Sequence, residues 1–430
     1  MADIRPFHGL RYDTTRVALP DVVCPPYDVI TPAAADTLRR RSPYNAVHIE
    51  LPVSPTGDPG ERYAAAAGLL DAWRTAGVLR SDDELSLYLV TQRFPGADGR
   101  ELARRGFVCR LRLEDFSRRV VLPHEKTHAG PKRDRLELLR ATNANLSQIF
   151  LLYADPDNEV GRALAAAAPP PQPALEARDG DGNPCSLQRL SGPVVEQVVA
   201  LMSGKQVLIA DGHHRYETAL AYRDERRAAG ESDGDWVMVC LACMDDPGLA
   251  VFPTHRLLKG VKVPPTDEVV GRLRAAFTVV SEHDGGPRDW APSMELVSRS
   301  SGPDKLLGLY FPAERRCVTL EPRGTAALDD LVRRGLSPVR ARLSVTLLAE
   351  LVFRDALGLD PEHLEGNIDF VKSVDDAVAD LDGGDYGLAA FLPATPMADV
   401  QAMAELGEAM PQKSTYFYPK LLTGLVFDQR

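Results

Sequence analysis

Polar side chains that could bind an anion follow an apolar run directly at residues 207–215. Val-Leu-Ile-Ala at 207–210 leads into Asp-Gly-His-His-Arg, and helix-favouring residues come next. A buried strand that passes through Asp-Gly into a helix presents the unpaired N–H groups of the helix N-terminus, where anions bind. Asp211 suits Mg²⁺ or a transferred proton. The alternative is a capped helix with solvated histidines. We predict that phosphate is bound by four residues of this turn, Gly212, His213, His214 and Arg215, and that Asp211 and His214 are catalytic.

A second polar cluster, at 123–135, reads Pro-His-Glu-Lys-Thr-His-Ala-Gly-Pro-Lys-Arg-Asp-Arg and contains the His-Glu-x-x-His spacing of zinc proteases. That chemistry needs both histidines on one face of an uninterrupted helix, and the prolines at 123 and 131 leave too little room for one. We therefore predict a polar loop that enters a helix, with Glu125 as candidate general base. The candidate ligands of a substrate carboxylate or phosphate are His124, Lys132 and Arg135. The alternative for the basic residues is a solvated helix face.

Three shorter segments add weaker candidates. Phe-Pro-Thr-His-Arg at 252–256 ends an apolar run with a pair that could bind an anion. The segment at 410–420 carries two lysines, hydroxyls and aromatic residues without the Gly-rich phosphate-loop pattern, so a packed strand is the alternative. Cys-Pro-Pro-Tyr-Asp at 24–28 is either a structural turn or part of the site. The candidate ligand-binding residues in these segments are Tyr27, Asp28, His255, Arg256, Lys413, Ser414 and Thr415.

The elements that must position these residues alternate between helix and strand. Thr31-Pro32 is a helix start, and the apolar segments at 84–91 and 105–113 predict an antiparallel hairpin. Strands at 236–244 and 249–252 are expected to form another hairpin, with Cys240 and Cys243 in the core. The mixture indicates an α+β (mixed α/β) fold. We expect residues 1–260 to form the nucleotide-binding and catalytic core. Residues 261–430 would form an α+β lobe whose tail returns to the site.

Composition restricts the class of protein. The chain has 430 residues, 44% of them apolar, and a net charge of −11. No apolar run is long enough to span a bilayer, no secretory signal is visible, and the six cysteines are scattered, so we expect a cytoplasmic protein. The acidic balance argues against a nucleic-acid partner. The sequence is compatible with a homodimer.

The motifs together resemble a bacterial and archaeal family filed as domain of unknown function 1015. The resemblance rests on Cys-Pro-Pro-Tyr-Asp-Val-Ile at 24–30, His-Glu-Lys-Thr at 124–127 and Ala-Asp-Gly-His-His-Arg-Tyr-Glu-Thr-Ala at 210–219. It continues through 252–256 and 410–420 and covers essentially the whole chain. The family name implies no activity.

A more distant resemblance implies chemistry. Asp-Gly-His-His-Arg at a strand–helix junction is similar to the phosphate-binding box of the ParB/sulfiredoxin-like superfamily, whose members with this variant include free L-serine kinases. The resemblance implies a ParB/sulfiredoxin-like core elaborated by a second lobe. It also implies a phosphotransferase that uses ATP or ADP with Mg²⁺ on a small hydroxylated metabolite, free L-serine being the best guess. His213 stands where sulfiredoxin chemistry needs a cysteine.

Three alternatives stay open at this point. The first is a nucleotide-binding regulator without turnover. The second is a phosphatase or other hydrolase that releases phosphate from phosphoserine. The third is a metal-dependent hydrolase built on His124, His128, His213 and His214, which predicts stoichiometric zinc in the purified protein.

Overall fold

The computed structural model describes the chain except for Pro59, 97–98, Lys126, His128, 168–174, 303–304 and Glu365. The chain divides into two compact units. Unit 1 comprises Met1–Pro123, Thr127–Ala250 and Pro419–Arg430. Unit 2 comprises His124–Lys126 and Val251–Tyr418. The chain passes from unit 1 to unit 2 after Ala250. The predicted division after residue 260 concerned functional lobes, and it stays a prediction.

A mixed sheet forms the centre of unit 1. Strand β11 (Val207–Asp211) is parallel to β6 (Val121–Leu122) and antiparallel to β8 (Ile149–Tyr153). The order continues through β12 (Trp236–Cys243), β5 (Glu101–Arg112), β4 (Leu87–Pro95), β10 (Pro184–Leu190) and β9 (Leu175–Arg178), and β1 (Ile4–Arg5) also pairs with β5. Strand β11 is an apolar run buried through Ala210, so its position inside the sheet follows from its composition.

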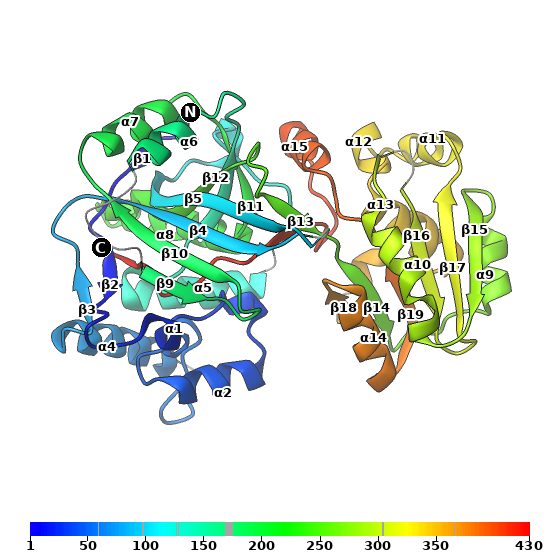
Figure 1. Ribbon diagram of the computed structural model, residues 1–430, viewed down its shortest axis with the longest axis horizontal. Coiled ribbons are helices and arrows are strands. Elements are labelled where there is room, and N and C mark those ends of the chain that lie inside the picture. The colour runs from blue at the N-terminus through cyan, green and yellow to red at the C-terminus, as the bar shows by residue number, and fades with distance from the viewer. Residues whose placement is uncertain are drawn as a thin grey trace. The chain divides into compact units, whose positions relative to one another are not determined.

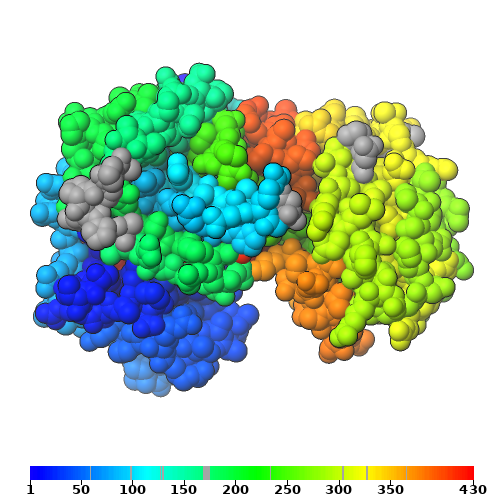
Figure 2. All heavy atoms as spheres, viewed as in Figure 1, coloured from blue at the N-terminus to red at the C-terminus, as the bar shows by residue number. Residues whose placement is uncertain are grey.

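Helices cover this sheet, as Figure 1 shows. Helices α5 (Ala129–Thr142) and α8 (His213–Ala228) pack on each other, as do α6 (Glu159–Ala166) and α7 (Pro193–Met202). The shared core includes Ile209 of β11, Tyr216 of α8 and Val198 of α7. The N-terminal part, with α2 (Pro32–Arg41) and α4 (Glu61–Thr75), is blue in Figure 2 and lies on the surface of unit 1.

The segment Pro419–Arg430 belongs to unit 1 and is tied into it by backbone pairing. Strand β21 (Asp428–Gln429) pairs with β7 (Ala144–Asn145), and isolated bridges join Thr423 to Cys24 and Phe427 to Leu10. The carboxylate of Asp428 accepts hydrogen bonds from Arg110 in β5. This anchoring fixes the position of Lys420, near the start of the segment.

Unit 2 contains a sheet in the order β15 (Phe277–Asp284), β17 (Arg316–Pro322), β16 (Leu307–Phe311), β19 (Tyr386–Phe391), β14 (His255–Lys259) and β18 (Ile368–Val371). Helices α10 (Pro287–Arg299) and α14 (Val374–Gly383) pack together, and Trp290 and Phe391 lie in its core. Further helices are α9 (Thr266–Leu273), α11 (Ala326–Arg333), α12 (Pro338–Ala341), α13 (Ser344–Leu347), a π-helix (Leu348–Ala356) and α15 (Met397–Leu406).

The structure confirms the α+β class and most of the expected elements. The Thr31 hydroxyl accepts from the Ala34 N–H at the start of α2, and β4 and β5 form the predicted antiparallel pair. Cys240 and Cys243 are buried in β12. The expected hairpin across 245–248 is wrong, because β13 (Ala250–Phe252) pairs with β20 (Tyr416–Tyr418) instead of β12.

None of the helices in the described parts of the chain is both long and apolar enough to cross a bilayer.

Candidate functional site

The strand–turn–helix predicted at 207–215 is present in unit 1. Strand β11 ends at Asp211, Gly212 adopts a left-handed conformation with φ of 94°, and α8 begins at His213. A Cβ atom on Gly212 would lie 3.0 Å from the guanidinium of Arg215, so a side chain is excluded by both backbone and space. His213 is buried and His214 half-buried. The N–H groups of the first turn of α8 therefore lie beside Arg215.

Asp211 lies between two cations. Nη2 of Arg215 donates to its Oδ2 at 2.7 Å, and the ammonium of Lys420 donates to its Oδ1. Both cationic side chains and the carboxylate are mostly buried, with 11–17% of each exposed. Burial alone would lower the pKa of Arg215, but the negative charge of Asp211, followed by that of Asp28, raises it above its ordinary value. The guanidinium is therefore held charged inside the protein.

The nitrogen donors of Arg215 differ in whether they have a hydrogen-bond acceptor. Nη1 donates to the carbonyl of Gln148 at 2.6 Å. Within the part of the chain that the structure describes, Nε is buried and lacks a hydrogen-bond acceptor. A buried donor that is left unsatisfied costs about 1–3 kcal/mol, so an anion that reaches Nε would gain that amount.

Arg104 of β5 supports the returning segment. Its guanidinium donates to the Gln92 side chain and to the carbonyl of Pro419, and the amide of Gln92 donates to the carbonyl of Lys420 at 2.9 Å. Burial lowers the pKa of Arg104 to about 10, and the charge of Asp211 acts in the opposite direction. Arg104 and Gln92 thus fix the backbone that carries Lys420.

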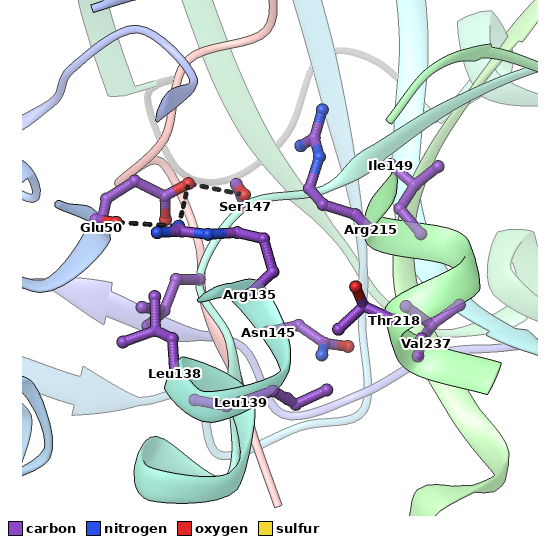
Figure 3. A pocket seen from close by; sticks show the side chains of 13 residues that line it. Glu50, Arg135, Leu138, Leu139, Asn145, Ser147, Ile149, Arg215, Thr218 and Val237 are labelled. Carbon is purple, nitrogen blue, oxygen red and sulfur yellow. Dashed lines mark hydrogen bonds and ion pairs between the residues drawn. The ribbon is translucent and has the colours of Figure 1, made fainter. Parts of the chain in front are cut away.

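A small cavity of about 60 Å³ lies between α5 and α8. Figure 3 shows the guanidinium of Arg135 directed at Glu50, which it contacts through a carbonyl hydrogen bond of 2.8 Å and an ion pair of 3.7 Å. Ser147 donates to the same carboxylate at 3.0 Å. Leu138 and Leu139 form an apolar end, and Arg215 extends away from it. The cavity has room for about two water molecules, which is too little for a nucleotide.

Tyr27 and Asp28 lie in the electrostatic environment of Arg215. The guanidinium of Arg135 lies 4.4 Å from the ring centroid of Tyr27. Burial raises the pKa of Tyr27 to about 12, and the charge of Arg215 opposes that shift. Asp28 is exposed and contributes to the raised pKa of Arg215. Arg135 itself is paired with Glu50, and its role as a substrate ligand stays a prediction.

Lys132 points at a carboxylate of its own unit. Its ammonium donates to Oε2 of Glu217 at 2.8 Å, and the hydroxyl of Thr127 donates to the same oxygen at 2.8 Å. Glu217 lies on α8, one turn after His213. These contacts dock the start of α5 on α8, so the predicted ligand role of Lys132 would require this ion pair to open.

The other predicted residues lie in unit 2. The ring of His124 makes a hydrogen bond of 3.2 Å with the hydroxyl of Thr415, and Glu125 accepts from the Lys413 N–H at 3.4 Å. Lys413 has a φ of 52°, and Ser414 donates to the carbonyl of Pro411. The two motifs of unit 2 are therefore neighbours, joined by backbone and side-chain contacts.

His255 and Arg256 are buried in structural contacts. Burial, followed by the charge of Arg256, lowers the pKa of His255 to about 3. The Arg256 guanidinium donates to the carbonyls of Thr254 and Lys413, and burial lowers its pKa to about 9. His255 is fully buried and Arg256 is 4% exposed. Arg256 supports the 413 loop, whereas His255 accepts from the Leu392 N–H. Substrate binding by this pair stays a prediction.

A zinc site receives no support from the described residues. No group of three or more His, Cys, Asp or Glu side chains that could hold a metal occurs among them. His124 and Glu125 are not helical, whereas α5 begins only at Ala129. His128 lies outside the described residues, so the part of this hypothesis that rests on it stays a prediction.

The model of one protein family matches residues 4–346, under the description "Protein of unknown function (DUF1015)". The chain belongs to this family. The match contains the motifs at 24–30, 124–127 and 210–219 and ends before the segment at 410–420. A search of curated proteins returned no match.

Solved structures give distant similarities to this DUF1015 member. A free serine kinase mutant in complex with AMP is 15% identical, with a TM-score of 0.33 over 69% of this chain and 84% of the other. A conserved hypothetical protein from Pyrococcus furiosus is 16% identical, with a TM-score of 0.31 over 69% and 87%. SbnI with a C-terminal truncation, from Staphylococcus aureus, is 11% identical, with a TM-score of 0.34 over 71% and 83%.

Sequence reasoning missed several residues that surround the candidate site of this DUF1015 member. Lys420 belongs to a recognised motif, but nothing near it in sequence indicates that it binds Asp211. Arg104 is one of many arginines in an alternating strand, and only its burial distinguishes it. Glu50 and Gln148 lie in segments with no motif. The one signal in the sequence was Arg104, an arginine at an inward-facing position of an alternating strand.

Proposed function

We propose that this protein is a phosphotransferase that moves a phosphoryl group from ATP or ADP to the hydroxyl of a small metabolite, with free L-serine as the best candidate. The observation that carries the proposal is the arrangement at the start of α8. There Arg215 and Lys420 hold Asp211 between them, beside a left-handed Gly212. Phosphoryl transfer depends mainly on positioned positive charge and orientation, which this arrangement provides.

The phosphate oxygens of the nucleotide would be bound by the N–H groups of the first turn of α8 and by Arg215. The buried Nε of Arg215 offers a donor, and the absence of a side chain at Gly212 lets phosphate approach the backbone. Lys420 would neutralise a second oxygen once it releases Asp211. The residues present therefore fit a nucleoside di- or triphosphate.

Magnesium would enter with the nucleotide. Mg²⁺ is usually bound by one or two carboxylates together with substrate phosphates, where it neutralises their charge. Asp211 is the carboxylate at the right place, although both of its oxygens take part in ion pairs. The described residues form no cluster of three acidic or imidazole ligands. A separate protein-built magnesium site therefore does not fit.

The remaining roles follow the sequence motifs. Glu125 would accept the proton of the substrate hydroxyl, and His214 would stay close to the transferred group. Tyr27 and Asp28 would bind substrate groups beside Arg215. The positive charge of Arg215 already acts on the pKa of Tyr27, and the negative charge of Asp28 acts on the pKa of Arg215. Of these, Tyr27 stays protonated at neutral pH, because burial raises its pKa to about 12, so it can donate a hydrogen bond.

A nucleotide-binding regulator without turnover is the second candidate. The observation that favours it is that Asp211 already has an ion-pair partner on each oxygen. A carboxylate in this state orients two cations for binding and is not available as a proton acceptor.

One experiment separates these candidates. The purified chain is titrated with ATP and with ADP by calorimetry, and the same samples are assayed by mass spectrometry for phosphoserine with L-serine and Mg²⁺. L-Alanine, which lacks the hydroxyl, is the matched acceptor control. If the chain is a kinase, it should bind nucleotide, and a phosphorylated product should form with L-serine but not with L-alanine. Binding without turnover on any hydroxy amino acid would leave the regulator, and the absence of nucleotide binding would contradict both.

A further inference from the structure

A second and larger cavity lies wholly in unit 2, with a volume of about 700 Å³. It lies at one end of the inner strands of the unit 2 sheet, where β16 begins and the antiparallel strands β17 and β19 end. Lys305 precedes β16, Pro322 ends β17, and Pro393 follows β19. Cavities of about 300–1,000 Å³ are the size that encloses small organic ligands. We call it the unit 2 cavity.

Two cations and one fixed carboxylate provide its polar side. Arg342, at the junction of α12 and α13, donates through Nε and Nη2 to Oδ1 of Asp399 at 3.0 and 2.6 Å. This contact orients the guanidinium and leaves Nη1 outside the pair. Lys305 donates to the backbone carbonyl of Arg342, so its ammonium lies beside the guanidinium. Both basic side chains line the cavity.

Among the residues that the structure describes, no carboxylate accepts a hydrogen bond from Lys305. Burial lowers the pKa of its ammonium, the charge of Asp399 opposes the shift, and the positive charge of Arg342 adds to it. Asp399 is already bound by Arg342, and Glu321, which also lines the cavity, is exposed so that solvent screens its charge. An incoming anion would therefore supply a counter-charge for this partly buried ammonium.

The cavity also has an apolar wall, formed by Pro322, Leu328, Leu343, Pro393, Ala394 and Pro396. Ser301, Glu321, Ser344 and Thr395 add polar side chains to the lining. An apolar wall with two basic groups on one side is complementary to a molecule with a hydrocarbon body and an anionic end. Inorganic phosphate would leave the apolar wall without a partner.

We propose that the unit 2 cavity binds a small organic acid, with its carboxylate between Lys305 and Arg342 and its apolar body against the proline and leucine wall. Every residue of its lining belongs to unit 2, whereas Gly212 belongs to unit 1. The cavity gives the protein a second ligand, separate from nucleotide and from the phosphoryl acceptor.

The test uses the full chain and ligand-observed NMR. The probes are monocarboxylates from butyrate to octanoate together with benzoate and phenylacetate, each paired with its primary amide. Phosphate monoesters of the same bodies form a second arm, and inorganic phosphate a third. The carboxylates are expected to bind and the amides to fail. Lys305→Met should weaken carboxylate binding by about tenfold or more, while Lys259→Met, which removes a lysine paired with Asp369 outside the lining, should not.

Three outcomes would overturn the proposal. Carboxylates and amides could bind alike, phosphate esters could bind while carboxylates fail, or Lys305→Met could bind as the unaltered chain does. A second measurement avoids dependence on a variant that folds poorly. Mass spectrometry follows acylation of Lys305 by an amine-reactive acylating reagent. A bound carboxylate should slow this reaction at Lys305 and leave the acylation of Lys259 unchanged. Unchanged labelling at saturating carboxylate would likewise contradict the site.

Discussion

Lys420 binds the carboxylate of Asp211 across 209 positions of sequence. The ammonium of Lys420 and the guanidinium of Arg215 bind different oxygens of Asp211. Each cation therefore limits how far the other can move the carboxylate. Neither contact is a surface ion pair, because all three side chains are mostly buried. Interactions of this kind are more sensitive to the loss of one partner than exposed pairs are.

Lys420→Met should weaken nucleotide binding and lower stability together. The substitution keeps the length of the side chain but leaves Asp211 with one cation, so we expect about a tenfold loss of affinity for ATP or ADP by calorimetry. Lys205→Met is the matched control, since Lys205 pairs with Asp155 at a similar exposure in the same unit. Equal affinity losses in both variants would show that the effect is general destabilisation.

Arg215→Lys should weaken nucleotide binding while the chain stays folded. Lysine keeps the positive charge but cannot present the forked donors that bind the Gln148 carbonyl, Asp211 and phosphate together. We expect a loss of about tenfold to a hundredfold in affinity, measured by calorimetry. Arg11→Lys alters a comparably buried pair with Asp82 and should bind as before. Retained affinity in Arg215→Lys would remove this residue from the site.

Gly212→Ala should destabilise unit 1 and displace Arg215. The left-handed φ costs an alanine about 1–2 kcal/mol, and the new methyl group would lie 3.0 Å from the guanidinium. Gly182→Ala is the control, because Gly182 has a φ of 84° with nothing close to its Cβ position. Urea unfolding should show a similar loss in both variants, and nucleotide affinity should fall in Gly212→Ala alone.

Glu125→Gln should remove turnover and keep nucleotide binding. Glutamine retains an acceptor for the Lys413 N–H but cannot take a proton, and loss of a general base typically costs about 10²–10⁴-fold in rate. The comparison is Glu408→Gln, whose carboxylate accepts from Ser337 in the same unit and should leave the rate unchanged. Phosphoserine formation at an undiminished rate in Glu125→Gln would contradict the assigned role.

His255→Gln should weaken the pH dependence of the free energy of unfolding of unit 2 at acid pH. The folded pKa of about 3 lies below the ordinary value of 6.5, so the unfolded chain binds the proton first as pH falls. The contribution of His255 to the free energy of unfolding is therefore complete above pH 6.5 and is lost progressively toward pH 3. The slope is at most about 1.4 kcal/mol per pH unit.

Hydrogen exchange of peptides from β14 at pH 7, 6 and 5 measures this slope. His363→Gln serves as control, since His363 is largely exposed and pairs with Asp360. If the slope is the same in His255→Gln as in the unaltered chain, the buried imidazole does not carry the pH dependence.

The strand–turn–helix at 207–215 could be predicted because its signals are local. The apolar run fixes a buried strand, and Asp-Gly followed by helix-favouring residues fixes the turn. The position of Lys420 depends instead on backbone pairing of 423–428 with distant segments, and no local pattern encodes that pairing.

Several charged residues that the pattern predicts as ligands already have partners within the protein. His255 and Arg256 follow an apolar run just as Asp211 does, yet both are buried in β14, and Arg256 donates to the Lys413 carbonyl. Lys132 and Arg135 are each paired with a glutamate from another element. Residue type shows what a side chain can bind, and only tertiary pairing shows whether it is already bound.

The chain order of the two units has a consequence for biosynthesis. Unit 1 is interrupted by Val251–Tyr418, so a ribosome delivers all of that insertion before it releases the segment that carries Lys420. Until then, Asp211 and Arg215 exist in a nascent unit 1 that lacks its second cation and the β21 pairing. Because domains generally fold as they emerge, the phosphate site would mature last, after unit 2 has had time to fold.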